Sequence, residues 1–425
     1  MLYVGLDVHA SRSTLCILDG NGQVVKNQEI KGPWSKLFDA VRSIDRPFSI
    51  CYEASCGYGT LYDQIRPLAA HVAVAHPGQL RLIYRSKRKN DRVDAEKLAK
   101  LLLLDLVPVV HVPKLDVRNW RSLITWRQRL IEKRVSTKNQ IRAVLRESGL
   151  ASPPGKKMWT KKSIAWLKEQ PLDNVGELKV QMCIEELQSL DRKIKMVEKE
   201  LAKISANHAG ITLLRTIPGV GIRTAETFCA WVDDIMRFRR NKQLGAYFGL
   251  VPCQDSSADR NRLGHITREG PAVMRKLLTE AAWMAIRKCP AIKAFFERIV
   301  GGKPERRKIA VVATCHHLVR VMGAMLRTGQ PYEGGIKKAA TGKAVKIPSP
   351  EIPSAKTTKE KTEERKCVDS CAGGERLRLT HCASNAAEER TAASNNTNDT
   401  AVQASDDSRQ CSRCSPAERY PLREQ

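Results

Sequence analysis

The sequence predicts an α/β domain at the N-terminus, then a helical arm, a mainly helical second domain and a disordered tail. Three observations support this fold class. Short apolar strands alternate with helical patterns up to about residue 110. A heptad pattern of apolar residues runs from 178 to 205. After Tyr332 the composition turns to Ser, Asn, Thr, Ala and charged residues, which cannot bury enough apolar surface to fold. We expect boundaries at 1–110, 111–210, 211–330 and 331–425.

The first domain is predicted to contain five strands. "LYVGLDVH" (2–9) indicates a buried strand, and "STLCILD" and "QVVKNQEI" flank the turn signal "GNG" at 20–22. "WSKLFDAVRSI" then predicts a helix, "FSICYEAS" a strand, "GTLYDQIRPLAA" a helix and "HVAVAH" the fifth strand. With the helix that follows, the order βββαβαβα is that of the ribonuclease H-like fold.

The arm is predicted to contain two long helices. The segment 116–149 combines an apolar stripe with a strongly basic opposite face, and "SPPGKK" ends it. From Val180 to Ile204 apolar residues recur at alternating spacings of three and four, which is typical of a coiled coil. This second helix could pack on the preceding helix of the same chain or on another copy, and the sequence favours neither.

The charge balance indicates the partner. The chain has a formal net charge of +28, while residues 346–425 carry 13 cationic and 13 anionic side chains, so the whole excess belongs to the body. A folded body this basic most often binds nucleic acid, with an anionic membrane surface as the less favoured alternative. No stretch approaches 18 apolar residues and no signal peptide precedes "MLYVGLDVH", so we expect a cytoplasmic protein with no membrane partner.

The thirteen cysteines are scattered, which favours free thiols in a reducing cytosol. Cys411 and Cys414 in the tail have zinc-knuckle spacing, but no second clean pair follows them.

Four carboxylates are candidates for chemistry. Asp7 stands inside the first strand, where Asp is disfavoured, and Glu53 ends an apolar strand. Asp91 and Asp94 open an amphipathic helix directly after a basic run at 81–89. Three of the four have a structural explanation: Asp7 as a hydrogen-bonded core residue, Asp91 as an N-cap and Asp94 as part of a capping box.

The predicted topology brings these carboxylates together. The first and fourth strands are neighbours in a ribonuclease H-like sheet, and a late helix lies against them. Four carboxylates at one end of the sheet repel one another, and two Mg²⁺ ions, which prefer oxygen ligands and substrate phosphates, relieve that repulsion. We therefore expect Asp91 and Asp94 both to cap the helix and to bind metal.

The second domain carries two further signals. "IPGVG" (217–221) resembles a helix-hairpin-helix DNA clamp, in which Gly219 and Gly221 let backbone N–H groups approach phosphates, although an ordinary interhelical turn is the alternative. "CQDSSADRNRLGHITREG" (253–270) is polar and predicts a loop. Its arginines could stabilise charge on a phosphoryl group: Arg260, Arg262 and Arg268.

The segments "GLDVH", "YEAS", "NDRVDAEKLA" and "AYFGLVP…SS…RLGHITREG" resemble the DEDD insertion-sequence transposases over about residues 2–330. The resemblance implies a RuvC-like domain, a coiled coil and a C-terminal transposase domain. It implies that Asp7, Glu53, Asp91 and Asp94 form the DEDD tetrad and that Ser257 attacks DNA to form a phosphoserine link. It also implies recombination guided by a structured non-coding RNA.

One departure from that family affects the serine. "SSADRN" stands where members commonly have glycines after the serine, so Ser256 is the alternative nucleophile.

These observations predict a transposase, a DNA recombinase of a bacterial insertion sequence. It would act on the nucleoid as a homo-oligomer (dimer or tetramer) with Mg²⁺, and the metals would activate Ser257 if the two domains form a composite site. The first alternative is a RuvC-like Mg²⁺-dependent nuclease that activates water. The second is a non-catalytic nucleic-acid-binding protein.

Overall fold

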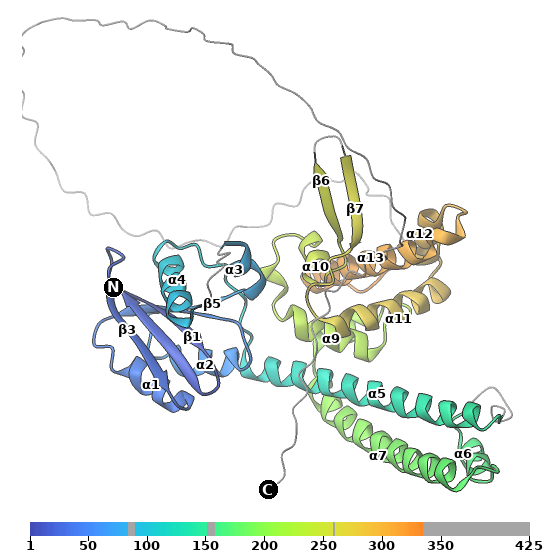
Figure 1. Ribbon diagram of the computed structural model, residues 1–425. Coiled ribbons are helices and arrows are strands. Elements are labelled where there is room, and N and C mark those ends of the chain that lie inside the picture. The colour runs from blue at the N-terminus through green and yellow to red at the C-terminus, as the bar shows by residue number, and fades with distance from the viewer. Residues whose placement is uncertain (84–89, 151–157, 258–259, 335–425) are drawn as a thin grey trace, which may run out of the picture. The chain divides into compact units, whose positions relative to one another are not determined.

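The computed structural model describes residues 1–83, 90–150, 158–257 and 260–334. The N-terminal part is a mixed α/β domain, and the C-terminal part is mostly helical (Figure 1). The N-terminal elements are β1 (Leu2–Val8), β2 (Arg12–Leu18), β3 (Val24–Lys31), α1 (Trp34–Arg42), β4 (Phe48–Glu53), α2 (Tyr58–Ile65), β5 (His71–Ala75), α3 (Pro77–Ile83) and α4 (Asp91–Leu103). The predicted order of strands and helices is confirmed, with α3 as an additional short helix.

The five strands form one sheet in the order β3-β2-β1-β4-β5. Neighbours in β3-β2-β1 are antiparallel, whereas β4 runs parallel to β1 and β5 parallel to β4. The expected adjacency of the first and fourth strands is therefore confirmed.

Helices cover both faces of this sheet. Leu2, Val4 and Leu6 of β1 join a core with side chains of α1 and α2, such as Leu61. The other face carries α4, whose small residue Ala95 packs against β2. Alternation of side chains along β1 thus assigns even-numbered positions to the α1/α2 face and odd-numbered positions to the α4 face.

The arm consists of α5 (Leu115–Glu147), α6 (Lys161–Lys168) and α7 (Asn174–Ser205). Helices α5 and α7 lie side by side in Figure 1, and apolar residues of both helices form two shared clusters. Ion pairs join them at Arg134–Asp191 (2.8 Å) and Arg127–Glu198 (2.6 Å). The sequence left two packing partners open for α7. In the structure α7 packs on α5, the other long helix of the same chain.

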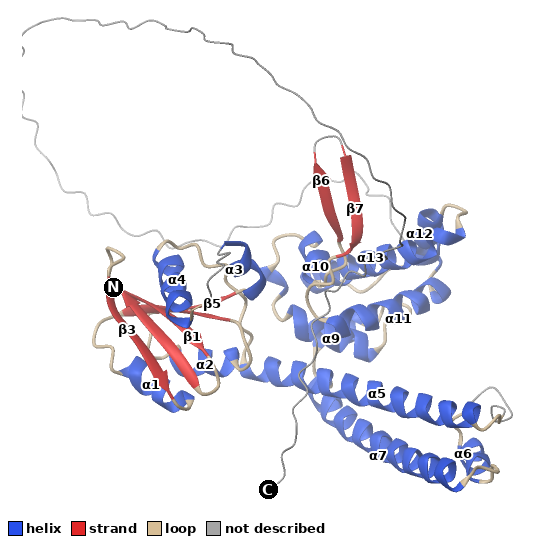
Figure 2. Cartoon of the chain, in the orientation of Figure 1, coloured by secondary structure: helices blue, strands red, loops and turns tan. Residues whose placement is uncertain are grey.

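The C-terminal elements are α8 (Ala209–Leu214), α9 (Ile222–Val232), the 3-10 helix η1 (Ile235–Arg237), α10 (Lys242–Tyr247), β6 (Pro252–Ser257), β7 (Arg260–Ile266), α11 (Ala272–Lys288), α12 (Pro290–Val300), η2 (Pro304–Arg306) and α13 (Arg307–Thr328). Strands β6 and β7 form an antiparallel hairpin that projects away from these helices (Figure 2). The prediction of a loop over 253–270 is therefore wrong for most of its length. Alternating polar residues such as Gln254 and Ser256 can form a strand without an apolar face when the hairpin is solvent-exposed.

The expectation that no segment is apolar and long enough to span a membrane is also wrong. Within the described residues, the helical segment Pro304–Thr328 is long and apolar enough to cross a membrane by length and composition, with a mean hydropathy of 1.6 over its most apolar stretch. Half of that stretch is buried inside the protein, where Ala310, Leu318 and Met322 belong to the main C-terminal core. Its apolar character is explained by that packing, so it is weak evidence for a membrane span.

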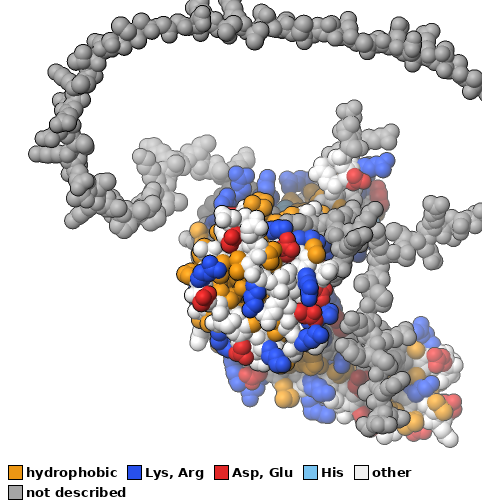
Figure 3. Space-filling view, turned by 60° about the vertical axis from the view of Figure 1, so that its left-hand side comes forward, with side chains coloured by type: hydrophobic (Ala, Val, Ile, Leu, Met, Phe, Trp, Pro, Cys, Tyr) orange, Lys and Arg blue, Asp and Glu red, His pale blue; other side chains and the backbone are white. Residues whose placement is uncertain are grey.

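The described surface mixes charged side chains with exposed apolar ones such as Leu82 and Met196. On the face shown in Figure 3, Lys and Arg side chains are spread around the domain with Asp and Glu side chains between them. Eight cysteines of the described residues are free, and two of these, Cys56 and Cys253, are exposed. The predicted disordered tail (331–425), except for its first four residues, and the Cys411/Cys414 pair lie outside the described residues.

Candidate functional site

Asp7 lies near the end of β1, on the sheet face that α4 covers. It pairs with Thr14 of β2, and the preceding residue, Leu6, lies opposite Tyr52 of β4. Because Leu6 enters the α1/α2 core, alternation along the strand directs Asp7 to the α4 face. Its side chain is 21% exposed, so the carboxylate is accessible to an ion or to a phosphate.

Gly5 allows α4 to lie directly on β1. A Cβ atom at this position would lie 2.0 Å from the carbonyl oxygen of Ala95 and 2.6 Å from the backbone nitrogen of Ala99. Any larger residue would force the helix away from the strand. Gly5 and Asp7 are on the same face, two residues apart, so this close contact places the first turn of α4 beside Asp7.

The start of α4 is capped by Asn90 and not by Asp91. The Asn90 side chain accepts a hydrogen bond from the backbone N–H of Arg92 at 3.1 Å, so the prediction that Asp91 is the N-cap is wrong. Asn and Asp are nearly equal as cap residues, and the helix begins at Asp91, one residue earlier than an Asp91 cap would place it. Asp91 and Asp94 both lie in the first turn, where the helix dipole favours negative charge.

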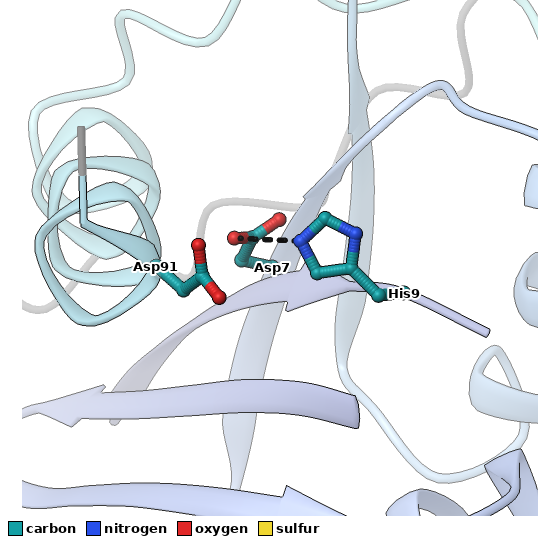
Figure 4. Close-up of side chains that lie close together, drawn as sticks. All are labelled: Asp7, His9 and Asp91. Atoms are coloured by element: carbon teal, nitrogen blue, oxygen red, sulfur yellow. Dashed lines mark ion pairs between the residues drawn. The ribbon is translucent and has the colours of Figure 1, made fainter. Parts of the chain in front are cut away.

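Three side chains meet at this point: Asp7, His9 and Asp91 (Figure 4). One ligand atom from each lies within 4.8 Å of the other two. The His9 Nε2 atom lies 3.5 Å from Asp7 Oδ2. Two of the four predicted carboxylates are therefore brought together, and they are joined by a histidine that the sequence analysis did not select. The signal was available, because residues two apart at the end of a strand project to the same side.

The other two predicted carboxylates are not part of this cluster of described residues. Glu53 is exposed at the end of β4. It follows Tyr52, which pairs with Leu6 of β1, so Glu53 and Asp7 stand at the same end of the two neighbouring strands. Asp94 accepts a hydrogen bond from Lys97 Nζ at 3.1 Å, one turn further along α4.

One cation, Arg12, pairs with a carboxylate of the cluster. Arg12, at the start of β2, lies 3.0 Å from Asp91 Oδ2 and 3.9 Å from Glu29. Of the predicted basic run, Arg81 is exposed on α3, whereas 84–89 lie outside the described residues. Cys51 pairs with Gly5 in the sheet, and burial raises the pKa of its thiol to about 12.

The "IPGVG" segment lies between α8 and α9, as predicted. Gly219 has φ of +101°, and a Cβ there would lie 2.4 Å from the backbone nitrogen of Ala285 in α11. The close packing of α11 therefore accounts for Gly219. Gly221 has open space around its Cα and is the N-cap of α9, so the N–H groups of that helix start are the accessible ones.

The two candidate serines lie at the end of β6. Ser256 pairs with Asn261, and Ser257 pairs with Arg260 across the hairpin. Ser256 is exposed, and its Oγ accepts a hydrogen bond from the Gln254 side chain at 3.0 Å. Arg262 and Arg268 are exposed as well, and Arg268 has φ of +58° at a sharp turn after β7.

Two transposase families match the chain. One, described as transposase and named for its DEDD motif and IS110, matches residues 4–149. The other, the transposase IS116/IS110/IS902 family, matches residues 211–297. These two ranges contain the α/β site and the serine hairpin, respectively.

Several curated proteins are similar over most of their length. The Sinorhizobium fredii protein y4qE, provisionally named a transposase, is 30% identical over 66% of this chain and 71% of its own length. The transposase for insertion sequence element IS1111A of Coxiella burnetii is 27% identical over 78% of this chain and 91% of its own. A provisionally named family 20 transposase of Pseudomonas aeruginosa is 27% identical over 78% and 98%.

The α/β domain with its acidic cluster and the helical domain with its serine hairpin thus both belong to enzymes that move DNA, and the chain is a DNA transposase. It belongs to the IS116/IS110/IS902 family of transposases. The alternative of a non-catalytic nucleic-acid-binding protein is not supported.

Proposed function

We propose that this transposase breaks and rejoins DNA with divalent metal ions held by the N-terminal domain and with a serine nucleophile from the β6–β7 hairpin. The observation that carries the proposal is the meeting of Asp7 and Asp91, which come from a strand end and a helix start 84 residues apart.

The sheet supports a ribonuclease H-like, RuvC-like identity for residues 1–110. Its order, with three antiparallel strands followed by two parallel ones, is the order expected for that fold. The division into 111–210 as a coiled-coil arm, 211–330 as the transposase domain and 331–425 as a disordered tail is part of the same proposal.

The donor set fits a hard divalent cation. Asp7 and Asp91 supply carboxylate oxygens that are partly exposed, and Glu53 ends the neighbouring strand at the same edge. Asp94 would complete the set after release of Lys97. Two Mg²⁺ ions would stabilise the charge on the attacking and leaving oxygens of a phosphodiester.

Ser257 is the proposed nucleophile. Its hydroxyl oxygen would attack a DNA phosphorus atom, forming an Oγ–P bond as the bond from phosphorus to one deoxyribose oxygen breaks. The serine proton leaves to a base or to water, and the departing sugar oxygen takes up a proton, so the phosphodiester is conserved as a phosphoserine ester. A sugar hydroxyl of the second strand reverses the step and releases the serine.

The remaining contacts concern nucleic acid and assembly. The N–H groups at the start of α9, beside Gly221, would approach DNA phosphates, whereas Gly219 is accounted for by its packing on α11. Arg260 and Arg262 of the hairpin, and Arg268 of the turn that follows it, would neutralise those phosphates. A structured guide RNA, a dimer or tetramer, and action on the bacterial nucleoid in the cytoplasm complete the proposal. Assembly of the two catalytic parts into one site, within the chain or between copies, would bring Ser257 to the metals.

The test is to trap a covalent protein–DNA adduct and to map it by peptide mass spectrometry. Ser257→Ala should eliminate the adduct while DNA binding persists, and Ser256→Ala is the matched control because the two serines are adjacent. An adduct on Ser256 would correct the register. Metal-dependent cutting without any adduct, in the wild type and in the double mutant, would instead support the water-activating nuclease.

A further inference from the structure

We propose that His9 supplies a nitrogen ligand to the metal ion held by Asp7 and Asp91, so that the site prefers a transition-metal cation such as Mn²⁺ over Mg²⁺. The inference rests on the proposed metal site and adds to it a residue outside the four carboxylates.

The distances suit one shared ion. His9 Nε2 lies 3.5 Å from Asp7 Oδ2, and the three ligand atoms lie within 4.8 Å of one another. Around a six-coordinate ion with bonds of about 2.1 Å, adjacent ligand atoms are about 3.0 Å apart and opposite ones about 4.2 Å. A contraction of about 0.5 Å would bring His9 Nε2 and Asp7 Oδ2 to the separation of adjacent ligands, and no pair of the three atoms exceeds the separation of opposite ligands by more than about 0.6 Å.

The backbone of His9 is fixed on both sides. Its N–H donates to the carbonyl oxygen of Arg12 at 2.9 Å, and its own carbonyl oxygen accepts from Trp34 Nε1 at 3.1 Å. The residue is thus held in the turn between β1 and β2, and Figure 4 shows its ring facing the Asp7 carboxylate. A fixed backbone lowers the entropy cost of holding the imidazole against an ion, although the side chain is 52% exposed.

Ligand chemistry gives the preference. Mg²⁺ is held almost entirely by oxygen atoms, whereas imidazole nitrogen is a common ligand of first-row transition metals. A set of two carboxylates and one imidazole therefore gains less with Mg²⁺ than with Mn²⁺. The competing explanation is that His9 only forms an ion pair with Asp7 and never contacts metal.

Pulsed electron paramagnetic resonance of Mn²⁺ bound to the full chain separates these explanations. An imidazole that coordinates Mn²⁺ adds a ¹⁴N modulation to the electron spin echo, which the wild type should show and His9→Gln should lose. In His9→Gln the affinity for Mn²⁺ should also fall about tenfold or more, and the affinity for Mg²⁺ should fall less. His71→Gln, at an exposed histidine that starts β5, is the matched control and should keep the signal.

Two results would be unfavourable in different ways. In the first, Mn²⁺ binds tightly without ¹⁴N modulation, and Asp7→Asn abolishes this binding whereas His9→Gln leaves it unchanged. That result would overturn the role of His9 and leave the carboxylate site intact. Mn²⁺ binding that Asp7→Asn does not weaken would overturn the metal site itself.

Discussion

Replacement of Gly5 by alanine should disable the site without touching any of its ligands. The new Cβ would lie 2.0 Å from Ala95 O and 2.6 Å from Ala99 N, both backbone atoms of α4 that cannot rotate away. Because ordinary contact begins at 3.4 Å, the helix and the strand must separate by about 1.4 Å at this point. Overpacking of this kind costs about 1–3 kcal/mol of unfolding free energy.

The same displacement moves Asp91 away from Asp7. A misplacement of about 1 Å in a catalytic site can lower the rate about 100-fold, so we expect at least that loss of recombination. The assay is excision and rejoining of a plasmid-borne element in bacterial cells, combined with thermal unfolding of the purified protein. Gly20→Ala is the matched control, since no atom lies within 4 Å of its Cβ position. Wild-type recombination and melting temperature for Gly5→Ala would refute the packing argument.

Three further predictions concern other parts of the chain. Arg12→Gln should raise the affinity for divalent metal by up to about fivefold in calorimetric titration. The substitution removes a half-exposed ion pair with Asp91, which competes with the metal and is worth at most about 1 kcal/mol. Weaker metal binding by the variant would mean that Arg12 helps to build the site. Deletion of 346–425 should leave the melting temperature and recombination unchanged, since that segment is neutral and poor in core residues, and a large fall in either would contradict this. Burial lowers the pKa of His316 and His317 in α13, so as the pH falls the unfolded chain takes up protons before the folded chain does, and the melting temperature should fall below pH 6.5. Replacement of both histidines by glutamine should flatten this dependence of melting temperature on pH. An unchanged dependence would refute the assignment of the effect to these two histidines.

The sheet could be predicted from the sequence because its strands are apolar and its turns carry clear signals. The hairpin around "GNG" and the buried runs at β4 and β5 each specify an element locally. The adjacency of β1 and β4 then followed from element order, and this is why Asp7 and Asp91 could be expected to meet.

Other features depend on contacts that a single sequence does not contain. Whether Asn90 or Asp91 caps α4 depends on one residue of helix register. Helix α7 packs on α5 because the chain turns back along α5 after α6, and the heptad pattern of α7 does not specify that turn. The β6–β7 hairpin has few apolar residues, so periodicity predicted a loop. His9 lies just outside β1, and only the folded turn, held by Arg12 and Trp34, brings its ring to Asp7 and Asp91.

The most direct measurement of the central claim is recombination by Asp7→Asn beside Asp39→Asn. Asp39 is an exposed aspartate of the same domain, paired only with Arg42 among described residues, and it controls for loss of one negative charge. Asp7→Asn should keep the circular dichroism spectrum and nucleic-acid binding of the wild type but form no recombinant junctions, while Asp39→Asn recombines normally. Wild-type levels of junctions from Asp7→Asn, in the presence of divalent metal, would contradict the assignment of Asp7 to a metal-dependent catalytic site.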